Sequence, residues 1–111
     1  MLGACIGDIN GSVYEFNAWK SLEFPLFGEK SEFTDDTVCT IAVAECLMDV
    51  TDPAATLCDW CRRYPGRGYG GRYALWLKDV SMGPYNSYGN GSAMRVSPAA
   101  LLAATLDEAL A

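Results

Sequence analysis

An apolar run at residues 38–48 follows directly on the polar tetrad Thr-Asp-Asp-Thr at residues 34–37. The run is apolar on nearly every side of a helix, which is typical of a helix enclosed by other elements rather than one on a surface. The tetrad offers a side-chain cap and two acids, and both favour a helix start. The chain is therefore expected to fold around a central helix at residues 36–48.

Small residues dominate residues 3–16, where Gly3, Gly7 and Gly11 recur at a spacing of four. This spacing predicts a helix that lies close against a neighbour, although each glycine costs a helix about 1 kcal/mol. The alternative is a set of turns. Further along, Thr51 or Asp52 is expected to cap a third helix.

The third helix is expected to begin at Pro53 and to end at the Pro-Gly pair of residues 65–66. A fourth helix is predicted at about residues 72–80. Residues 67–73 contain glycine and arginine, as some RNA-binding segments do, but this stretch is short and isolated in an acidic chain. It is interpreted as a loop that connects two helices.

Residues 81–96 are rich in Gly, Asn and Ser and predict one long ordered loop, which in a compact domain usually signals function. Ser97 and Pro98 then start a last helix with one apolar stripe. The stripe consists of Leu102, Leu106, Ala109 and Leu110. Asp107 and Glu108 are expected in the last turn of this helix, where the helix dipole repels them, unless the helix frays first.

These elements predict an all-α fold, a compact multi-helix orthogonal bundle that forms a single domain over residues 1–111. Apolar residues, counted with glycine, exceed the share of about 45–50% that is usual in soluble domains. The excess predicts apolar surface that this chain alone does not cover.

The chain is acidic, with a net charge of −6 and a pI near 4.4. This charge disfavours a general attraction to nucleic acid or to an anionic membrane, and it favours a divalent cation. The sequence has no histidine. Acid, base and metal chemistry must therefore rest on carboxylates and hydroxyls.

The five cysteines lie in apolar surroundings and are interpreted as buried thiols of a cytoplasmic protein. Cys58 and Cys61 have the C-x-x-C spacing, but a zinc site would need more ligands and no βαβ pattern supports a redox site. Residues 1–7 lack the basic flank of a secretory signal, and residues 98–111 are too short to span a bilayer.

Two polar clusters are candidates for chemistry. Asp35 and Asp36 diverge by about 100° in a regular helix, but at a helix start they can converge with Thr34 on a Mg²⁺ ion, which prefers oxygen ligands. The alternative is a plain helix cap. Asp8 and Glu15 share one helix face and offer more oxygen ligands or a carboxylate for acid and base catalysis. The alternative is a solvated face, and the pair gains weight only if the two clusters meet.

A third candidate is the stretch at residues 83–95, which offers backbone N–H groups, amides, hydroxyls and one cation. Its glycines allow the backbone to approach a ligand, and successive N–H groups can form a nest for a phosphate. The stretch matches neither the dinucleotide-binding nor the P-loop spacing. A plain structural turn is the alternative.

In order and spacing, these segments resemble the successive N-terminal motifs of the ADP-ribosylglycohydrolase family, of the dinitrogenase-reductase-activating glycohydrolase type. The segments are residues 3–8 (Gly-Ala-Cys-Ile-Gly-Asp), 14–15 (Tyr-Glu), 33–37 (Phe-Thr-Asp-Asp-Thr), 69–70 (Tyr-Gly), 89–95 (Gly-Asn-Gly-Ser-Ala-Met-Arg) and Pro98. The resemblance implies an all-α fold with a two-magnesium centre. It also implies a hydrolase that releases ADP-ribose from a modified protein or from a small ADP-ribose conjugate.

The resemblance assigns roles by position. Thr34, Asp35 and Asp36 would hold one Mg²⁺. Glu15 and Asp36 would be the catalytic carboxylates, with Glu15 at the edge between metal and substrate. The residues that would cradle the diphosphate and ribose are Gly89, Asn90, Gly91, Ser92 and Met94.

This chain departs from the family pattern, because relatives continue to a second acidic motif, Asp-x-Asp, that completes both metal sites. Thr105, Asp107 and Glu108 do not reproduce that motif. The chain is thus expected to be an N-terminal portion with weak or no turnover and at most one well-supplied metal. Three hypotheses stay open: a hydrolase active as the complete protein, an ADP-ribose or Mg²⁺ binding module, and a structural fragment that self-associates as a homo-oligomer.

Overall fold

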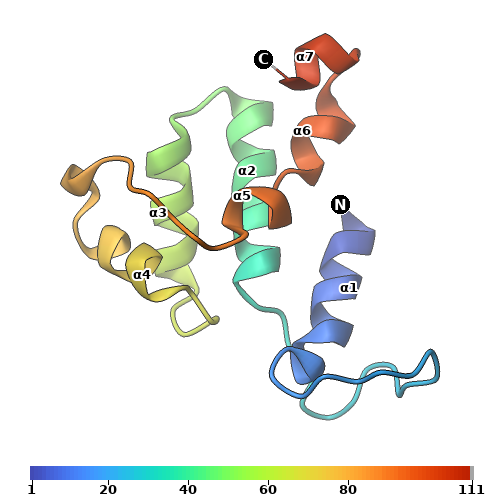
Figure 1. Cartoon of the computed structure of the whole chain (residues 1–111). Coiled ribbons are helices and arrows are strands. Elements are labelled where there is room, and N and C mark those ends of the chain that lie inside the picture. The colour runs from blue at the N-terminus through green and yellow to red at the C-terminus, as the bar shows by residue number, and fades with distance from the viewer. Residues whose placement is uncertain (111) are drawn as a thin grey trace.

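The computed structural model describes residues 1–110, and within that range it contains helices, turns and loops but no strand (Figure 1). This confirms the all-α prediction. The α-helices are α1 (Leu2–Gly11), α2 (Asp35–Asp49), α3 (Pro53–Arg63), α4 (Gly71–Lys78), α5 (Gly91–Met94), α6 (Ser97–Leu102) and α7 (Leu106–Leu110). Two short 3-10 helices, η1 (Ser12–Tyr14) and η2 (Val80–Met82), follow α1 and α4.

Helix α2 is the central element, as expected from its apolar sequence. Its start is capped by Thr34, whose side-chain oxygen accepts a hydrogen bond from the Asp36 N–H at 3.2 Å. The helix packs against α1, α3, α5 and α6. Most of its residues from Thr37 to Cys46 are buried, so neighbouring helices cover it on several sides.

Helices α3 and α4 also follow the predicted boundaries closely. Asp52 caps α3 by accepting a hydrogen bond from the Ala55 N–H at 2.7 Å, and Pro53 is the first helical residue. The segment between α3 and α4 is a connecting loop, as interpreted from the sequence. Gly66 and Gly68 have φ of 77° and 94° there, a backbone conformation that glycine adopts without strain.

The core lies between α2 and α3. Its fully buried members are Val38, Cys39 and Cys61. Partly buried aromatic and aliphatic side chains surround them, namely Phe33, Leu57, Trp60, Tyr69, Tyr73, Leu77 and Met94. Cys46 and Cys58 are buried as well and Cys5 is half-buried, so the interpretation of the cysteines as largely buried free thiols is confirmed.

Helix α1 is helical, as predicted, but it ends at Gly11 and gives way to η1, and its glycines do not provide close packing. A Cβ atom added at Gly3, Gly7 or Gly11 would meet no other heavy atom within 4 Å. The prediction of a close glycine contact is therefore wrong. The physical reason is that α1 joins the rest of the fold through polar contacts of Asp8, and α1 buries no residue of its own.

The C-terminal third departs from the expectation in two places. The predicted long loop at residues 81–96 begins within η2 and also contains a helical turn, α5, which lies across α2 in Figure 1. One last helix was predicted, but the structure has two, α6 and α7, because the backbone is extended at Ala103, with ψ of 137°. Ser97 does not act as the cap of α6, since its hydroxyl is buried without a hydrogen-bond partner.

Asp107 and Glu108 lie in the first turn of α7, not in the last turn of a longer helix. Thr105 Oγ1 accepts a hydrogen bond from the Glu108 N–H at 3.2 Å, and the Glu108 carboxylate accepts one from the Ala104 N–H at 2.8 Å. Thr105 thus acts as a side-chain cap, and the Glu108 carboxylate accepts from the residue before the cap, so the pair is a variant of the capping box and starts a new helix. The acids therefore lie at the favourable end of the helix dipole and the predicted repulsion is wrong.

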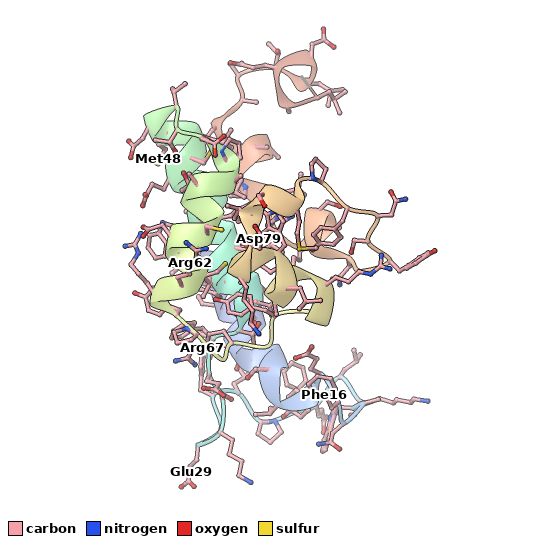
Figure 2. The ribbon with its side chains drawn as sticks, turned by 90° about the vertical axis from the view of Figure 1, so that its left-hand side faces the viewer. Phe16, Glu29, Met48, Arg62, Arg67 and Asp79 are labelled. Atoms are coloured by element: carbon pink, nitrogen blue, oxygen red, sulfur yellow. The ribbon has the colours of Figure 1, made fainter. Side chains whose placement is uncertain are left out.

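An irregular segment at residues 15–34 connects α1 to α2 and is mostly exposed. In Figure 2 its labelled side chains, Phe16 and Glu29, lie at the end of the molecule opposite to Met48. Phe16 is 89% exposed. Many other large apolar side chains are exposed, which agrees with the expected uncovered surface. Across residues 1–110, no helix combines the length and the apolar character that crossing a membrane requires.

Candidate functional site

Asp8 joins the two polar clusters that the sequence places on separate helices. Its Oδ1 accepts a hydrogen bond from Thr34 Oγ1 at 2.6 Å. Its Oδ2 accepts three more, from the Thr34 N–H at 2.8 Å, the Thr37 N–H at 3.2 Å and Thr37 Oγ1 at 2.6 Å. Asp8 of α1 and the start of α2 therefore meet. Glu15 lies beyond α1 and η1, so the expected helix face shared by Asp8 and Glu15 is wrong, because the α-helix ends at Gly11.

A cavity of about 420 Å³ opens beside this junction. Its polar walls carry the carboxylates of Asp8, Glu15 and Asp36 and the side-chain amide of Asn90. Two hydroxyls, from Ser12 and Thr40, complete them. No basic side chain of the described residues lines this acidic cavity, so its negative charge is uncompensated.

The uncompensated negative charge affects the pKa values of the two carboxyl groups at the start of α2. Burial, together with the charges of Asp8 and Glu15, raises the pKa of Asp36. Burial and the charge of Asp36 raise the pKa of Asp35 to about 6, with smaller contributions from Glu15 and Asp8. Both acids thus hold their protons more tightly than free aspartate does, and carboxyl groups with raised pKa values are enriched at functional sites.

A second cavity of about 510 Å³ lies between α4, α5 and the loop that joins them. Every residue assigned to substrate binding lines it, namely Gly89, Asn90, Gly91, Ser92 and Met94. The rings of Tyr73 and Trp76 stack with centroids 5.5 Å apart, and both form part of its wall. Arg95 lies over the Tyr73 ring at 5.7 Å and lines the same larger cavity.

The larger and the acidic cavity adjoin, because Asn90 and Met94 line both. Asp35 lines the larger cavity and Asp36 the acidic one. The two neighbouring aspartates therefore point to different cavities, as their 100° separation on a helix requires. One face of the molecule thus combines a glycine-rich loop, a cation and aromatic rings with a cluster of carboxylates.

A comparison with known protein families matches residues 1–111, the whole chain, to the family described as ADP-ribosylglycohydrolase. The chain belongs to the ADP-ribosylglycohydrolase family. The resemblance inferred from the motifs is therefore confirmed. No solved structure matches this chain.

The metal that this ADP-ribosylglycohydrolase fold implies has a partial donor set here. Among residues 1–110, no three His, Cys, Asp or Glu side chains come together as a group that could hold a metal ion. Both Asp8 oxygens and the Thr34 hydroxyl are engaged in hydrogen bonds. Asp36 and Glu15 remain as carboxylates facing the acidic cavity, and they suit Mg²⁺, which binds to few carboxylates and keeps several waters.

Sequence reasoning missed two residues that line the larger cavity, Tyr73 and Trp76, and the contacts that Asp8 makes. Asp8 was recognised as a candidate acid but was not expected to organise the start of α2. Tyr73 and Trp76 were not singled out, although an aromatic pair at a spacing of three lies on one helix face and is detectable from sequence. Their position beside the glycine-rich loop, by contrast, depends on how α4 packs.

Proposed function

We propose that this chain binds ADP-ribose conjugates across the two adjoining cavities. In this proposal the adenosine and diphosphate occupy the larger cavity, and the ribose that carries the bond to the acceptor reaches the acidic cavity. The observation that supports the proposal is that Asn90 and Met94 line both cavities. The two cavities are therefore adjacent, as one elongated ligand that occupies both would require. Their volumes are in the range of small-molecule sites.

The larger cavity has the chemistry that an adenosine diphosphate group needs. Gly89 and Gly91 leave the backbone accessible to a phosphate, and the Arg95 guanidinium attracts its negative charge. The flat faces of Tyr73 and Trp76 offer a stacking surface for a base. Together they favour a ligand with one aromatic end and one anionic centre.

The acidic cavity has groups suited to hydrolysis at the anomeric carbon of the ribose. Glu15 is exposed at its wall, so its carboxylate can accept a proton from an attacking water molecule. Asp36, whose pKa is raised, lines the same cavity as the second carboxylate, where it would position the ribose hydroxyls. Mg²⁺ would be held by Asp36 and Glu15, with Thr34 and Asp35 next to them, and the chemistry it supplies when bound is Lewis acidity.

Calorimetric titration of ADP-ribose into the purified chain tests the binding proposal. We expect Asn90→Ala to weaken binding by about tenfold, since one lost hydrogen bond of about 1.4 kcal/mol has that effect. Tyr88→Ala is the matched control, because Tyr88 lies in the same loop but is 100% exposed and lines neither cavity. Binding that is absent, or that Asn90→Ala leaves unchanged, would contradict the proposal.

Release of ADP-ribose from a modified protein, measured with and without Mg²⁺, separates the hydrolase from a second candidate, a binding module without turnover. The incomplete donor set among residues 1–110 favours the second candidate for this chain, so we expect weak or no release. Any Mg²⁺-dependent release should be lost in Glu15→Gln. Rapid release by the 111-residue chain would overturn this expectation.

A further inference from the structure

Two cysteines that the proposed reaction does not use face each other in the core. Cys39 lies on α2 and Cys61 on α3, and their side chains are 0% and 2% exposed. Their sulfur atoms are 3.8 Å apart. The hydroxyl of Tyr73 lies 3.4 Å from the Cys61 sulfur and 3.9 Å from the Cys39 sulfur. These groups form a buried cluster of two thiols and one phenol.

This pair is close enough to be joined. A disulfide needs a sulfur–sulfur distance of about 2.05 Å, so the two side chains together must move by roughly 1.8 Å. Cys58 has the C-x-x-C spacing to Cys61 along α3, yet it is Cys39 on the neighbouring helix whose sulfur contacts Cys61. The structure therefore identifies a different partner for Cys61 from the one that the motif indicates.

The hydrogen bonds of the cluster favour one thiolate. The Cys39 thiol and the Tyr73 hydroxyl stabilise a negative charge on Cys61 and lower its pKa to about 7, although burial opposes this. The same hydrogen bond, together with burial, raises the pKa of Cys39. The hydrogen bonds thus favour a thiolate on Cys61 over one on Cys39, and a thiolate is the form that reacts with oxidants.

The larger cavity offers a route to the pair. Cys39 lines that cavity together with Tyr73 and Arg95, and the Cys61 sulfur lies behind it, in contact with the Cys39 sulfur. Arg95 also contributes positive charge, which favours the thiolate form of both cysteines. Burial from bulk solvent and proximity to the cavity together favour small hydroperoxides over large disulfide reagents.

We propose that Cys39 and Cys61 are a redox modification site, at which hydrogen peroxide or another hydroperoxide joins α2 to α3 by a reversible disulfide beside the larger cavity. One sulfur, as thiolate, attacks the terminal oxygen of the hydroperoxide and the O–O bond breaks, which gives a sulfenic acid. The leaving oxygen takes up a proton from solvent and departs as water from hydrogen peroxide or as an alcohol from an organic hydroperoxide. The second sulfur attacks the first, the S–S bond forms and water leaves. The two sulfurs together lose two electrons, and these reduce the peroxide.

The disulfide would alter the wall of the larger cavity. Tyr73 loses the thiol partners of its hydroxyl, and its ring both stacks on Trp76 and lies beneath Arg95. This consequence rests on the proposed function, because it concerns the residues proposed to hold the adenosine diphosphate group. We expect oxidation to weaken ADP-ribose binding and reduction with dithiothreitol to restore it.

Peptide mapping of the peroxide-treated chain, without a reducing agent, tests the modification site and requires no ligand. We expect the loss of two of the five free thiols and a crosslinked peptide pair that contains Cys39 and Cys61. Cys39→Ser and Cys61→Ser should abolish the crosslink, whereas Cys46→Ser, a buried cysteine outside the cluster, should retain it. If a variant fails to fold, the peptide map of the peroxide-treated chain without substitutions still shows whether the Cys39–Cys61 crosslink forms.

Several results would overturn the proposal. They are unchanged thiols, a Cys58–Cys61 link, a crosslink between chains, and a sulfinic acid on one cysteine without a crosslink. A Cys39–Cys61 disulfide that leaves ADP-ribose binding unchanged would refute the coupling to the cavity. Because mapping needs no ADP-ribose, a missing disulfide and a failed binding proposal are distinguishable.

Discussion

Asp35 is a residue on which two electrostatic effects oppose each other. At the first turn of α2 the helix dipole favours its negative charge. Burial and the neighbouring carboxylates disfavour that charge and dominate, since the pKa rises from an ordinary 3.8 to about 6. A raised carboxyl pKa means that the ionised side chain lowers the stability of the fold. Such a cost is typical of a functional site.

We expect Asp35→Asn to stabilise the chain at neutral pH. The cost of ionised Asp35 is absent below about pH 4, grows as the pH rises from 3.8 to about 6 and is complete above that. Because the half-exposed side chain is screened by solvent, we expect a gain of about 1 kcal/mol at pH 7 and none at pH 4. Urea denaturation at both pH values measures the difference.

The matched control is Glu29→Gln, which removes an exposed carboxylate from the segment between α1 and α2. It should leave the free energy of unfolding nearly unchanged at both pH values. A loss of stability in Asp35→Asn at pH 7 would show that the helix dipole, and not burial, dominates at this residue. Added Mg²⁺ should stabilise the unmodified chain more than Asp35→Asn if the carboxylate contributes to metal binding.

At the scale of the element, local signals account for the helices that were predicted well. The Asp52 side chain caps α3 by accepting from a backbone N–H three residues later, and Pro53 is the first helical residue. Thr34 caps α2 by accepting from a backbone N–H two residues later. The same kind of signal, Thr105 followed three residues later by Glu108, starts α7 and was overlooked because the stripe of leucines suggested one continuous helix. Caps were thus the better guide to helix boundaries than periodicity.

The C-terminal end of α2 stores strain at Val50, which has φ of 52° and ψ of 50°. This left-handed conformation is costly for a β-branched residue, whereas glycine adopts it readily. Since the Val50 side chain is 90% exposed, its removal loses little buried surface. We expect Val50→Gly to raise the free energy of unfolding by about 1 kcal/mol, measured by thermal or urea denaturation.

Met48→Gly is the control for this prediction. Met48 is also exposed but lies within α2, where glycine should lower stability by about 1 kcal/mol. Equal losses of stability in both variants would show that Val50 does not adopt the left-handed conformation in solution.

At the scale of the whole molecule, the fold is looser than its length requires. Its radius of gyration is 15.0 Å, whereas a compact domain of this length has about 13 Å. Helix α1 buries no residue, and large apolar side chains are exposed on most elements. The hypothesis of self-association therefore stays a prediction, as do a cytoplasmic location and Mg²⁺ dependence.

Asp8 is expected to hold α1 on the rest of the molecule. An asparagine in its place would turn an N–H₂ group toward the N–H and hydroxyl donors of Thr34 and Thr37. We expect Asp8→Asn to lower the free energy of unfolding by about 2 kcal/mol and to increase amide hydrogen exchange in α1 more than in α3. Asp49→Asn, at the exposed far end of α2, is the control and should change neither.

The sequence by itself determined the α-helical class, the central position of α2, the caps at Thr34 and Asp52, and the family. These depend on residues that are neighbours in the chain or on motifs in a given order. Only the tertiary structure decided that Asp8 meets Thr34, 26 residues away, that Asp35 and Asp36 face different cavities, and that the Cys61 thiol contacts the Cys39 thiol. Such contacts depend on how helices pack, because side chains distant in sequence meet only when the whole chain has folded.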